Sequence, residues 1–258
     1  MRRAGGLPLA TWLGFFKLLQ RYHRYEVVNL EPLLQPGAKL IVGYHGRPLA
    51  LDLCMLTVTL HERLGYLPHG VAHGAFDRIP GMRAVADGLG FVTGDDARLA
   101  QAVDRGEHVL LQPGGTREGC RSFRHRYRVS WGERLGYLRL AVRYRLPIVP
   151  VGGSGMDDAF LGLNDGYALG RRVGMPARLP LWLGVGATGV WPLSLPFPVK
   201  MTQWVGEPLT RHLAPGFDTG DRASMLQAHG EVAGAVQALL DRARGRSPAR
   251  VAGKAVVR

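Results

Sequence analysis

The sequence predicts an α/β fold in which a central, mostly parallel sheet is flanked by helices. Between residues 39 and 151, short apolar runs of strand length alternate with longer segments that have helical periodicity. This alternation is typical of parallel strands joined by helical crossovers. Two of the apolar runs also end in polar, glycine-containing turns. Such turns are expected at the carboxyl ends of parallel strands, where ligands bind.

Strands and helices are expected to alternate through most of the chain, because runs of β-branched residues favour strands and spaced apolar residues favour helices. By these patterns the strands cover residues 39–44, 70–72, 91–93, 108–112 and 148–151. The helices between them cover residues 49–64, 81–89, 97–105 and 132–144. A strand over residues 199–205 and a helix over residues 222–244 follow.

Residues 179–200 interrupt the alternation. Four prolines in this segment exclude a regular helix, and Trp182, Trp191 and Phe197 are interleaved with them. The segment either covers the core or brings its aromatic side chains to a membrane or an acyl chain. We favour the first interpretation.

The composition fits a single globular domain with short extensions. The chain has 258 residues, of which 46% are hydrophobic and 21% are charged, so it can bury a substantial core. We expect an N-terminal membrane-interface helix over residues 1–30, a main domain over residues 31–244 and a basic, flexible tail over residues 245–258.

The N-terminal segment is dense in apolar and aromatic residues. Residues 7–19 contain a tryptophan, two phenylalanines and several leucines, and Arg21 and Arg24 follow. This run is too short to span a bilayer, which needs about twenty apolar residues. Lys17 interrupts it, so a secretion signal is not favoured. Two interpretations stay open, namely a helix lying in the membrane interface and a terminal helix packed on the core.

The chain is strongly basic. Lysine and arginine outnumber aspartate and glutamate by 33 to 20, which gives a formal charge of +13 and a pI near 10.5. This charge favours contact with anionic lipid, nucleic acid or an anionic substrate. No zinc-finger spacing, RNP-like motif or helix-turn-helix accompanies the basic residues, so no nucleic-acid partner is expected. A membrane lipid surface is the expected partner.

The sequence predicts neither a metal site nor a disulfide framework. Cys54 and Cys120 lie far apart and form no CxxC pattern. His69 and His73 have helical spacing, but no HExxH pattern accompanies them, so we expect structural or surface roles for both.

The first candidate catalytic motif follows the strand over residues 39–44. His45 comes directly after this strand, and Asp52 is expected in the first turn of the next helix. A carboxylate bonded to one imidazole nitrogen makes the other nitrogen a better base. The alternative is a histidine that only caps the turn and an aspartate that is only solvated.

The second candidate motif is a polar turn after the strand over residues 108–112. It offers the backbone N–H groups of Gly114 and Gly115, the Thr116 hydroxyl and the Arg117 guanidinium, which suits phosphate or carboxylate. Glu118 can pair with Arg117 or with a neighbouring base. The spacing is not that of a P-loop.

Other polar clusters are weaker candidates. The GGSGM run at residues 152–156 lacks the second glycine of a Gly-x-Ser-x-Gly elbow, so a serine hydrolase is not favoured. The acid pairs at residues 95–96 and 157–158 are expected to lie in loops or at helix starts.

Four segments, taken in order, resemble the four sequence blocks of the glycerolipid acyltransferase superfamily. They are the His45/Asp52 pair, the IPGM run at residues 79–82, the QPGGTRE turn at residues 112–118 and the LPIVPV run at residues 146–151. The resemblance covers residues 39–210. The Pro-Gly-Gly form of the third block and the WGERLG run at residues 131–136 are most similar to the branch containing diacylglycerol acyltransferases and related ester-forming enzymes.

The resemblance implies that residues 31–244 form an acyltransferase domain. It implies acyl transfer from acyl-CoA or acyl carrier protein to a lipid alcohol, either a neutral glycerolipid or a lysophospholipid. His45 would be the general base, Asp52 would orient it, and residues 114–118 would bind substrate. No cofactor beyond the acyl donor and no metal is then needed. The expected location is peripheral, at the cytoplasmic face of a membrane.

The chain departs from the superfamily pattern at three positions. Six residues separate His45 from Asp52, where the usual first block has four. Gly114 stands where phosphate-recognising members carry a glutamate, and Gly94 stands where they carry an arginine. A neutral or weakly polar alcohol is therefore favoured over glycerol phosphate. Two alternatives stay open, a lipid ester hydrolase and a non-catalytic lipid-binding or membrane-tethering protein.

Overall fold

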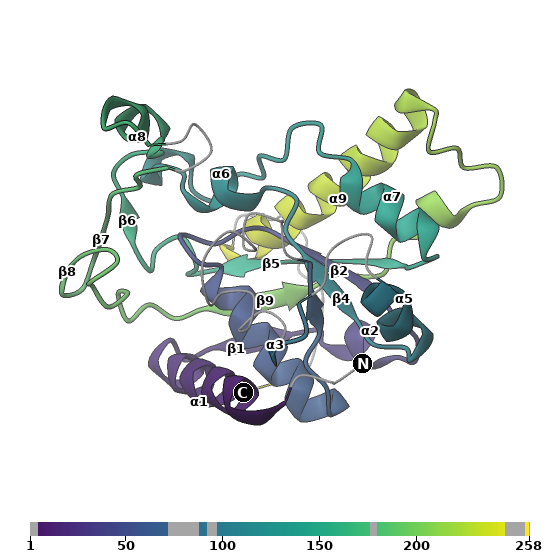
Figure 1. The fold of residues 1–258 in the computed structure, drawn as a ribbon, viewed down its shortest axis with the longest axis horizontal. Helices are drawn as coiled ribbons and strands as arrows, with labels where there is room; N and C mark the ends of the chain where they lie inside the picture. The colour runs from purple at the N-terminus through teal and green to yellow at the C-terminus, as the bar shows by residue number, and fades with distance from the viewer. Residues whose placement is uncertain (1–4, 72–87, 92–96, 176–179, 246–255, 258) are drawn as a thin grey trace.

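The computed structural model describes residues 5–71, 88–91, 97–175, 180–245 and 256–257 (Figure 1). A seven-stranded sheet in the order β10-β1-β9-β5-β2-β4-β3 forms its centre. The central strand β2 pairs in parallel with β5 and β4, and β4 pairs in parallel with β3. Strand β9 runs antiparallel to β5 and parallel to β1. The predicted α/β class with a mostly parallel sheet is confirmed.

The strands of this sheet are short. Their bounds are β1 Glu26–Val28, β2 Leu40–Gly43, β3 His69–Gly70, β4 Val109–Leu111, β5 Ile148–Ser154, β9 Thr202–Val205 and β10 Val256–Val257. All four residues of β2 are buried, as expected for a strand covered on both faces. Strand β5 continues three residues past the predicted end at residue 151, because β9 pairs with it as far as Ser154.

Helices cover both faces of the sheet. In Figure 1, α1 and α3 lie on one side of the sheet, and α7 and α9 lie on the other. One buried cluster joins α1 and α3 to Ile41 and Val149, and a second joins α7 and α9 to Leu40 and Ile148. The helices are α1 Gly6–Tyr22, α2 Glu31–Leu34, α3 Leu51–Leu64, α5 Ala97–Asp104, α6 Gly115–Gly119, α7 Gly136–Arg143, α8 Tyr167–Arg172 and α9 Arg222–Ala243, with 3-10 turns η2 Phe123–His125 and η3 Arg211–Leu213.

Gly43 allows helix α3 to lie close to the sheet. A Cβ atom at this position would lie 2.6 Å from the Leu53 side chain on α3 and 2.9 Å from Val151 on β5. These distances are too short for van der Waals contact, so a larger residue would push α3 away from the strand. The glycine at the end of β2 therefore helps to fix the turn that carries His45.

Helix α1 packs on the domain with one face. Phe16 is buried, and Trp12 donates a hydrogen bond from Nε1 to Thr57 Oγ1 of α3 at 3.0 Å. Phe15 and Leu18 are 53% and 64% exposed on its other side. Helix α1 is therefore a terminal helix packed on the core, which was one of the two interpretations. Contact of its exposed apolar face with a membrane stays a proposal. No helix among the described residues is both long enough and apolar enough to cross a bilayer.

Residues 180–200 form part of a small separate sheet, with no helix, as the prolines predicted. Its three strands are β6 Leu161–Gly162, β7 Gly184–Gly186 and β8 Gly189–Val190. Trp182 is buried and its ring packs edge-on against Phe160 and Trp191. The favoured interpretation, core cover, is correct for these aromatic residues.

Some expected boundaries differ from the structure. The second motif is not a turn, because residues 115–119 form helix α6. The helix predicted from residue 132 begins only at Gly136, since Gly132 has a left-handed φ of +55°. Most of the expected helix over residues 81–89 and strand over residues 91–93 lies outside the described residues, as does most of the tail, whose residues 256–257 pair with β1.

Candidate active site

The two candidate motifs meet at one edge of the sheet. Strands β2 and β4 are parallel neighbours, so the segments that leave their carboxyl ends lie side by side. One segment carries His45 and the other forms α6. A hydrogen bond of 2.9 Å from the His45 backbone N–H to Glu118 Oε2 joins them. The edge predicted for ligand binding is therefore where the motifs converge.

One ring nitrogen of His45 is engaged by a backbone carbonyl, and the other is free of hydrogen bonds to the described residues. Its Nδ1 lies 3.0 Å from the carbonyl oxygen of Gly46, so the N–H of the neutral ring is placed on Nδ1. This leaves Nε2 as the nitrogen with a free lone pair. Burial lowers the pKa of His45 to about 4, which keeps the imidazole neutral at physiological pH. Part of the surface of this residue nevertheless stays exposed.

Asp52 lies near His45, and neither oxygen of its buried carboxylate makes a hydrogen bond to a described residue. The carboxylate is buried in the first turn of α3, and its Oδ1 would lie 2.7 Å from a Cβ atom at Gly46. Burial raises the pKa of Asp52 to about 7, and the negative charge of Asp157 adds to this effect. In this structure Gly46 holds the His45 Nδ1 and Asp52 makes no direct bond to the ring, so the orienting role of Asp52 stays a prediction.

Glu118 ties the two motifs to a third segment. Its buried carboxylate accepts hydrogen bonds from the His45 N–H, from the Ser130 N–H at 2.9 Å and from Trp131 Nε1 at 3.1 Å. Burial raises the pKa of Glu118, and these donors oppose the shift. The sequence placed Glu118 among the substrate contacts, but the side chain faces the protein. Its geometry is that of a positioning residue.

The other residues of the second motif differ in exposure. A side chain at Gly114 would overlap the Glu118 carboxylate, so glycine is required there. Gly115 has a left-handed φ of +49°, which also favours glycine. Thr116 and Arg117 are exposed, and the Arg117 guanidinium lies 5.6 Å from the centre of the Tyr167 ring. Both side chains are accessible, and their contact with substrate stays a prediction.

Gly119 lies directly against the His45 imidazole. A Cβ atom at this position would lie 2.6 Å from His45 Cε1 and 2.7 Å from Nδ1. The missing side chain therefore gives the ring the space in which it makes its bond to Gly46.

Gly119→Ala is expected to displace the His45 ring and to lower activity about tenfold or more, because a small misplacement of a reacting group is costly. The matched control is Gly230→Ala in α9, where an added Cβ atom meets nothing within 4 Å. The turnover number of both variants should be measured beside their thermal unfolding. Equal activity in the two variants would contradict the assignment.

A buried charge network supports the backbone of His45. The Arg121 guanidinium donates to the His45 carbonyl oxygen at 2.8 Å and to Asp157 Oδ1 at 2.8 Å. Asp157 is fully buried, accepts a hydrogen bond of 2.6 Å from the Tyr44 hydroxyl and lies 3.6 Å from Arg47 Nε. Arg121 also lies 4.0 Å from the centre of the Tyr44 ring.

The sequence predicted that Asp157 is a loop or helix-start acid, and it does lie in the turn that follows β5. Its burial at the centre of this network was not predicted. One signal was available, because the carboxyl end of β5 lies at the same edge of the sheet as His45. No sequence spacing identified Arg121 or Arg47 as its partners.

His69 has a structural role, as expected. Its ring nitrogens lie 2.9 Å from the Gly90 carbonyl oxygen and 2.8 Å from Glu107 Oε2, and the side chain is buried. His73 lies outside the described residues. Among the residues that the structure describes, no three metal-binding side chains come together.

Known lipid enzymes are similar to this chain in sequence. It is 28% identical over 222 residues to the bovine "DGAT1/2-independent enzyme synthesizing storage lipids", and this match covers 86% of the chain and 60% of that protein. It is 32% identical over 142 residues to the Arabidopsis thaliana "Phytyl ester synthase 1, chloroplastic", covering 51% of the chain and 20% of that protein. The chain thus spans about 60% of the length of the bovine relative. No protein-family model matches it.

A solved structure has a similar fold. The 1-acyl-sn-glycerophosphate (LPA) acyltransferase PlsC from Thermotoga maritima superposes with a TM-score of 0.50 at 17% identity, covering 89% of this chain and 78% of that one. The similarity in fold extends over most of the chain, as does the sequence similarity to the bovine relative. These findings confirm the resemblance seen in the sequence blocks: the chain is similar in both fold and sequence to the glycerolipid acyltransferase superfamily.

Proposed function

We propose that the protein is an O-acyltransferase that moves a fatty acyl group from a thioester donor to a lipid alcohol. The observation that carries this proposal is the state of His45, a neutral imidazole with Nδ1 engaged by Gly46 and Nε2 available. A neutral imidazole of this kind suits general-base catalysis on a hydroxyl group. The relatives named for the synthesis of storage lipids and phytyl esters support the same class of reaction.

In the proposed reaction, His45 Nε2 removes the proton from the acceptor hydroxyl as its oxygen attacks the thioester carbonyl. A C–O bond forms and a tetrahedral oxyanion results. The C–S bond then breaks, and the imidazolium returns its proton to the leaving thiolate. Acyl-CoA and acyl carrier protein both provide such a thiol. Neither a covalent acyl-enzyme nor a metal is part of this proposal.

Asp52 is proposed to act on His45 through charge. The Asp52 carboxylate lies against Gly46, the residue next to His45. When it is ionised, its negative charge would stabilise the imidazolium that forms during the reaction. This role needs no direct hydrogen bond, so it fits both the six-residue spacing and the Nδ1 contact with Gly46.

The pH profile tests this role. Both proposed active forms are deprotonated, Asp52 above a pKa of about 7 and His45 above a pKa of about 4, so activity should be full above pH 7 and fall as the pH decreases through it. Asp52→Asn should lower activity about tenfold to a hundredfold, less than removal of the base. It should also move the acid limb of kcat/KM toward pH 4. An acid limb that stays in place would remove Asp52 from the mechanism.

The proposed acceptor is a neutral or weakly polar alcohol. A phosphate monoester is held best by converging charged donors. Arg117 is the only cation of the second motif, and it lies beside the Tyr167 ring. A lysophospholipid is the second candidate acceptor.

The function is tested with purified protein, a labelled long-chain acyl-CoA or acyl carrier protein, and a panel of lipid alcohols. Labelled ester is the expected product, and the panel identifies the acceptor. Release of free fatty acid alone would indicate hydrolysis in place of transfer. Donor that stays intact with every acceptor would favour a lipid-binding protein without turnover.

We also propose that the protein lies on the cytoplasmic face of a membrane through the exposed side of α1. Phe15 and Leu18 project there, and the charge of +13 favours an anionic leaflet. Deletion of α1 would be a poor test, because Phe16 belongs to the core.

Phe15→Ser combined with Leu18→Ser should weaken binding to anionic vesicles, measured by flotation, about tenfold or more. The reason is that the favourable free energy of burying each apolar side chain in the interface is lost. Leu34→Ser, at an exposed leucine in α2, should have little effect. Flotation that is the same for all three proteins would contradict the proposed interface.

A further inference from the structure

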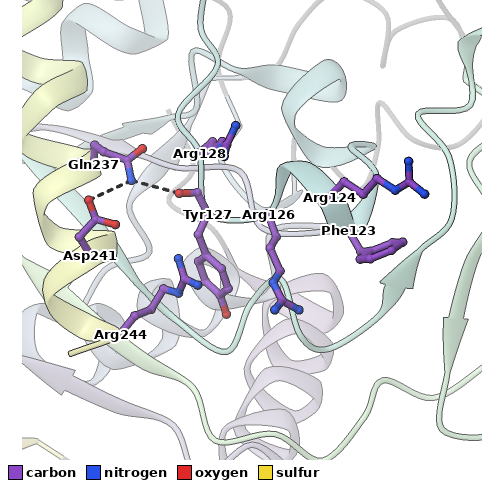
Figure 2. Close-up of a pocket in the computed structure, with 8 residues that line it drawn as sticks. All are labelled: Phe123, Arg124, Arg126, Tyr127, Arg128, Gln237, Asp241 and Arg244. Carbon is purple, nitrogen blue, oxygen red and sulfur yellow. Dashed lines mark hydrogen bonds between the residues drawn. The ribbon is translucent and has the colours of Figure 1, made fainter. Parts of the chain in front are cut away.

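An arginine-rich pocket lies between residues 123–128 and the carboxyl-terminal end of α9 (Figure 2). Its volume is about 540 Å³, within the range of sites that hold small ligands. The lining residues are Phe123, Arg124, Arg126, Tyr127, Arg128, Gln237, Asp241 and Arg244. None of them belongs to the four sequence blocks.

The charge of the pocket is strongly positive. Four arginines line it against one acid, Asp241, which lies within 3.3 Å of the Gln237 amide. Arg126 approaches a second acid, Asp158, at 3.5 Å across an exposed contact. Arg124 and Arg128 form no ion pair with any residue that the structure describes. The charges of these two guanidinium groups are therefore not balanced by a carboxylate of the described residues.

The pocket is held in shape by the residues that line it. Gln237 accepts a hydrogen bond from the Val129 N–H and donates one to the Tyr127 carbonyl oxygen, both at 3.0 Å. The Arg244 guanidinium lies 4.2 Å from the centre of the Tyr127 ring. In Figure 2, Arg126 and Arg244 stand on either side of this ring. Two cations are thus positioned before any ligand binds.

The pocket is connected to the candidate active site through one residue. The Tyr127 backbone N–H donates to Asp157 Oδ2 at 2.6 Å, and Asp157 binds the same Arg121 that holds the His45 carbonyl oxygen. The Tyr127 hydroxyl also accepts a hydrogen bond of 2.7 Å from the Gly155 N–H at the end of β5. The pocket therefore lies at the same edge of the sheet as His45.

We propose that this pocket binds a phosphate-bearing group. Planar guanidinium groups match the oxygens of phosphate, and several cations facing one cavity suit a group with more than one negative charge. Two sources supply this chemistry. One is the nucleotide part of coenzyme A in the acyl donor, which rests on the proposed function. The other is the phosphorylated headgroup of an anionic lipid.

The test measures binding without turnover, with coenzyme A, with pantetheine, which lacks phosphate, and with vesicles containing phosphatidylglycerol. Two pocket variants are used, Arg126→Gln with Arg244→Gln, and Arg124→Gln with Arg128→Gln. The second pair changes only exposed side chains, so it guards against misfolding in the first. The control is Arg63→Gln with Arg139→Gln, which removes the same charge from exposed positions on α3 and α7.

Coenzyme A should bind about tenfold or more weakly to a pocket variant and unchanged to the control, while pantetheine binding should not depend on the variant. If the pocket variants bind vesicles more weakly than the control does, and coenzyme A equally well, the bound phosphate belongs to the lipid headgroup. If the pocket variants bind both ligands as the control does, the proposal is overturned. His45→Ala should keep coenzyme A binding and lose transfer. If the parent protein binds coenzyme A but forms no ester with any acceptor, the result counts against the proposed function and not against the pocket.

Discussion

Replacing Asp157 with alanine is expected to reduce the free energy of unfolding by about 3–5 kcal/mol, because it leaves buried positive charge without its partner. Arg47 and Arg121 are 1% and 6% exposed, and both lie against the Asp157 carboxylate. The substitution also removes the acceptor for the Tyr44 hydroxyl and the Tyr127 N–H. Urea denaturation at neutral pH measures the loss.

Asp158→Ala is the matched control for this experiment. Asp158 is the next residue in the chain, but its side chain is 42% exposed; it pairs with Arg126 at the surface and accepts a hydrogen bond of 2.7 Å from the Tyr127 hydroxyl. Its loss should therefore cost about 1–2 kcal/mol, less than the loss of Asp157. If both variants unfold at the same urea concentration, the network does not stabilise the fold as proposed.

The Asp157 variant should also lose activity at temperatures where it remains folded. Arg121 would lose the carboxylate that fixes its guanidinium and with it the geometry of its bond to the His45 carbonyl oxygen. The expected change is a lower kcat. An unchanged kcat in the folded variant would show that Arg121 keeps its place without Asp157.

His45→Ala is expected to lower the rate of ester formation by about 10²- to 10⁴-fold, the range typical of a general base. The ring is partly exposed and makes one polar contact, with Gly46, so the fold should be retained. Single-turnover measurements with labelled acyl-CoA separate this loss in the chemical step from any change in binding.

The control for this variant is His61→Ala, a partly exposed histidine near the end of α3. It should keep the rate of the parent protein. Ester formation by His45→Ala within about threefold of the parent would mean that another group removes the proton, and the base would have to be reassigned.

The local sequence was sufficient for the fold class and for the position of His45. Buried runs of apolar residues identified β2 and β5, and helical periodicity identified α3, α5 and α9. These signals depend on residues close together in the chain. A histidine directly after a central parallel strand therefore had a predictable place, at the carboxyl edge of the sheet.

Local sequence was insufficient where a conformation depends on partners from other elements. Residues 113–119 were expected to form a turn because of their proline and glycines, yet residues 115–119 form a helical turn. In that turn, Glu118 points inward to donors from His45, Ser130 and Trp131. Ser130 and Trp131 lie in a loop, and no local pattern predicted their hydrogen bonds to Glu118.

The sequence by itself determined that this protein has an α/β domain with a histidine at the carboxyl edge of its central parallel strands. Only the tertiary structure decided what holds that histidine, because the Arg121–Asp157 pair joins residues 36 positions apart and Arg121 reaches His45 across 76 positions. Pairing of buried charges depends on which side chains meet after the chain has folded, and no local pattern encodes that meeting. The same holds for the arginine pocket, whose two walls, residues 123–128 and α9, come together only in the folded domain.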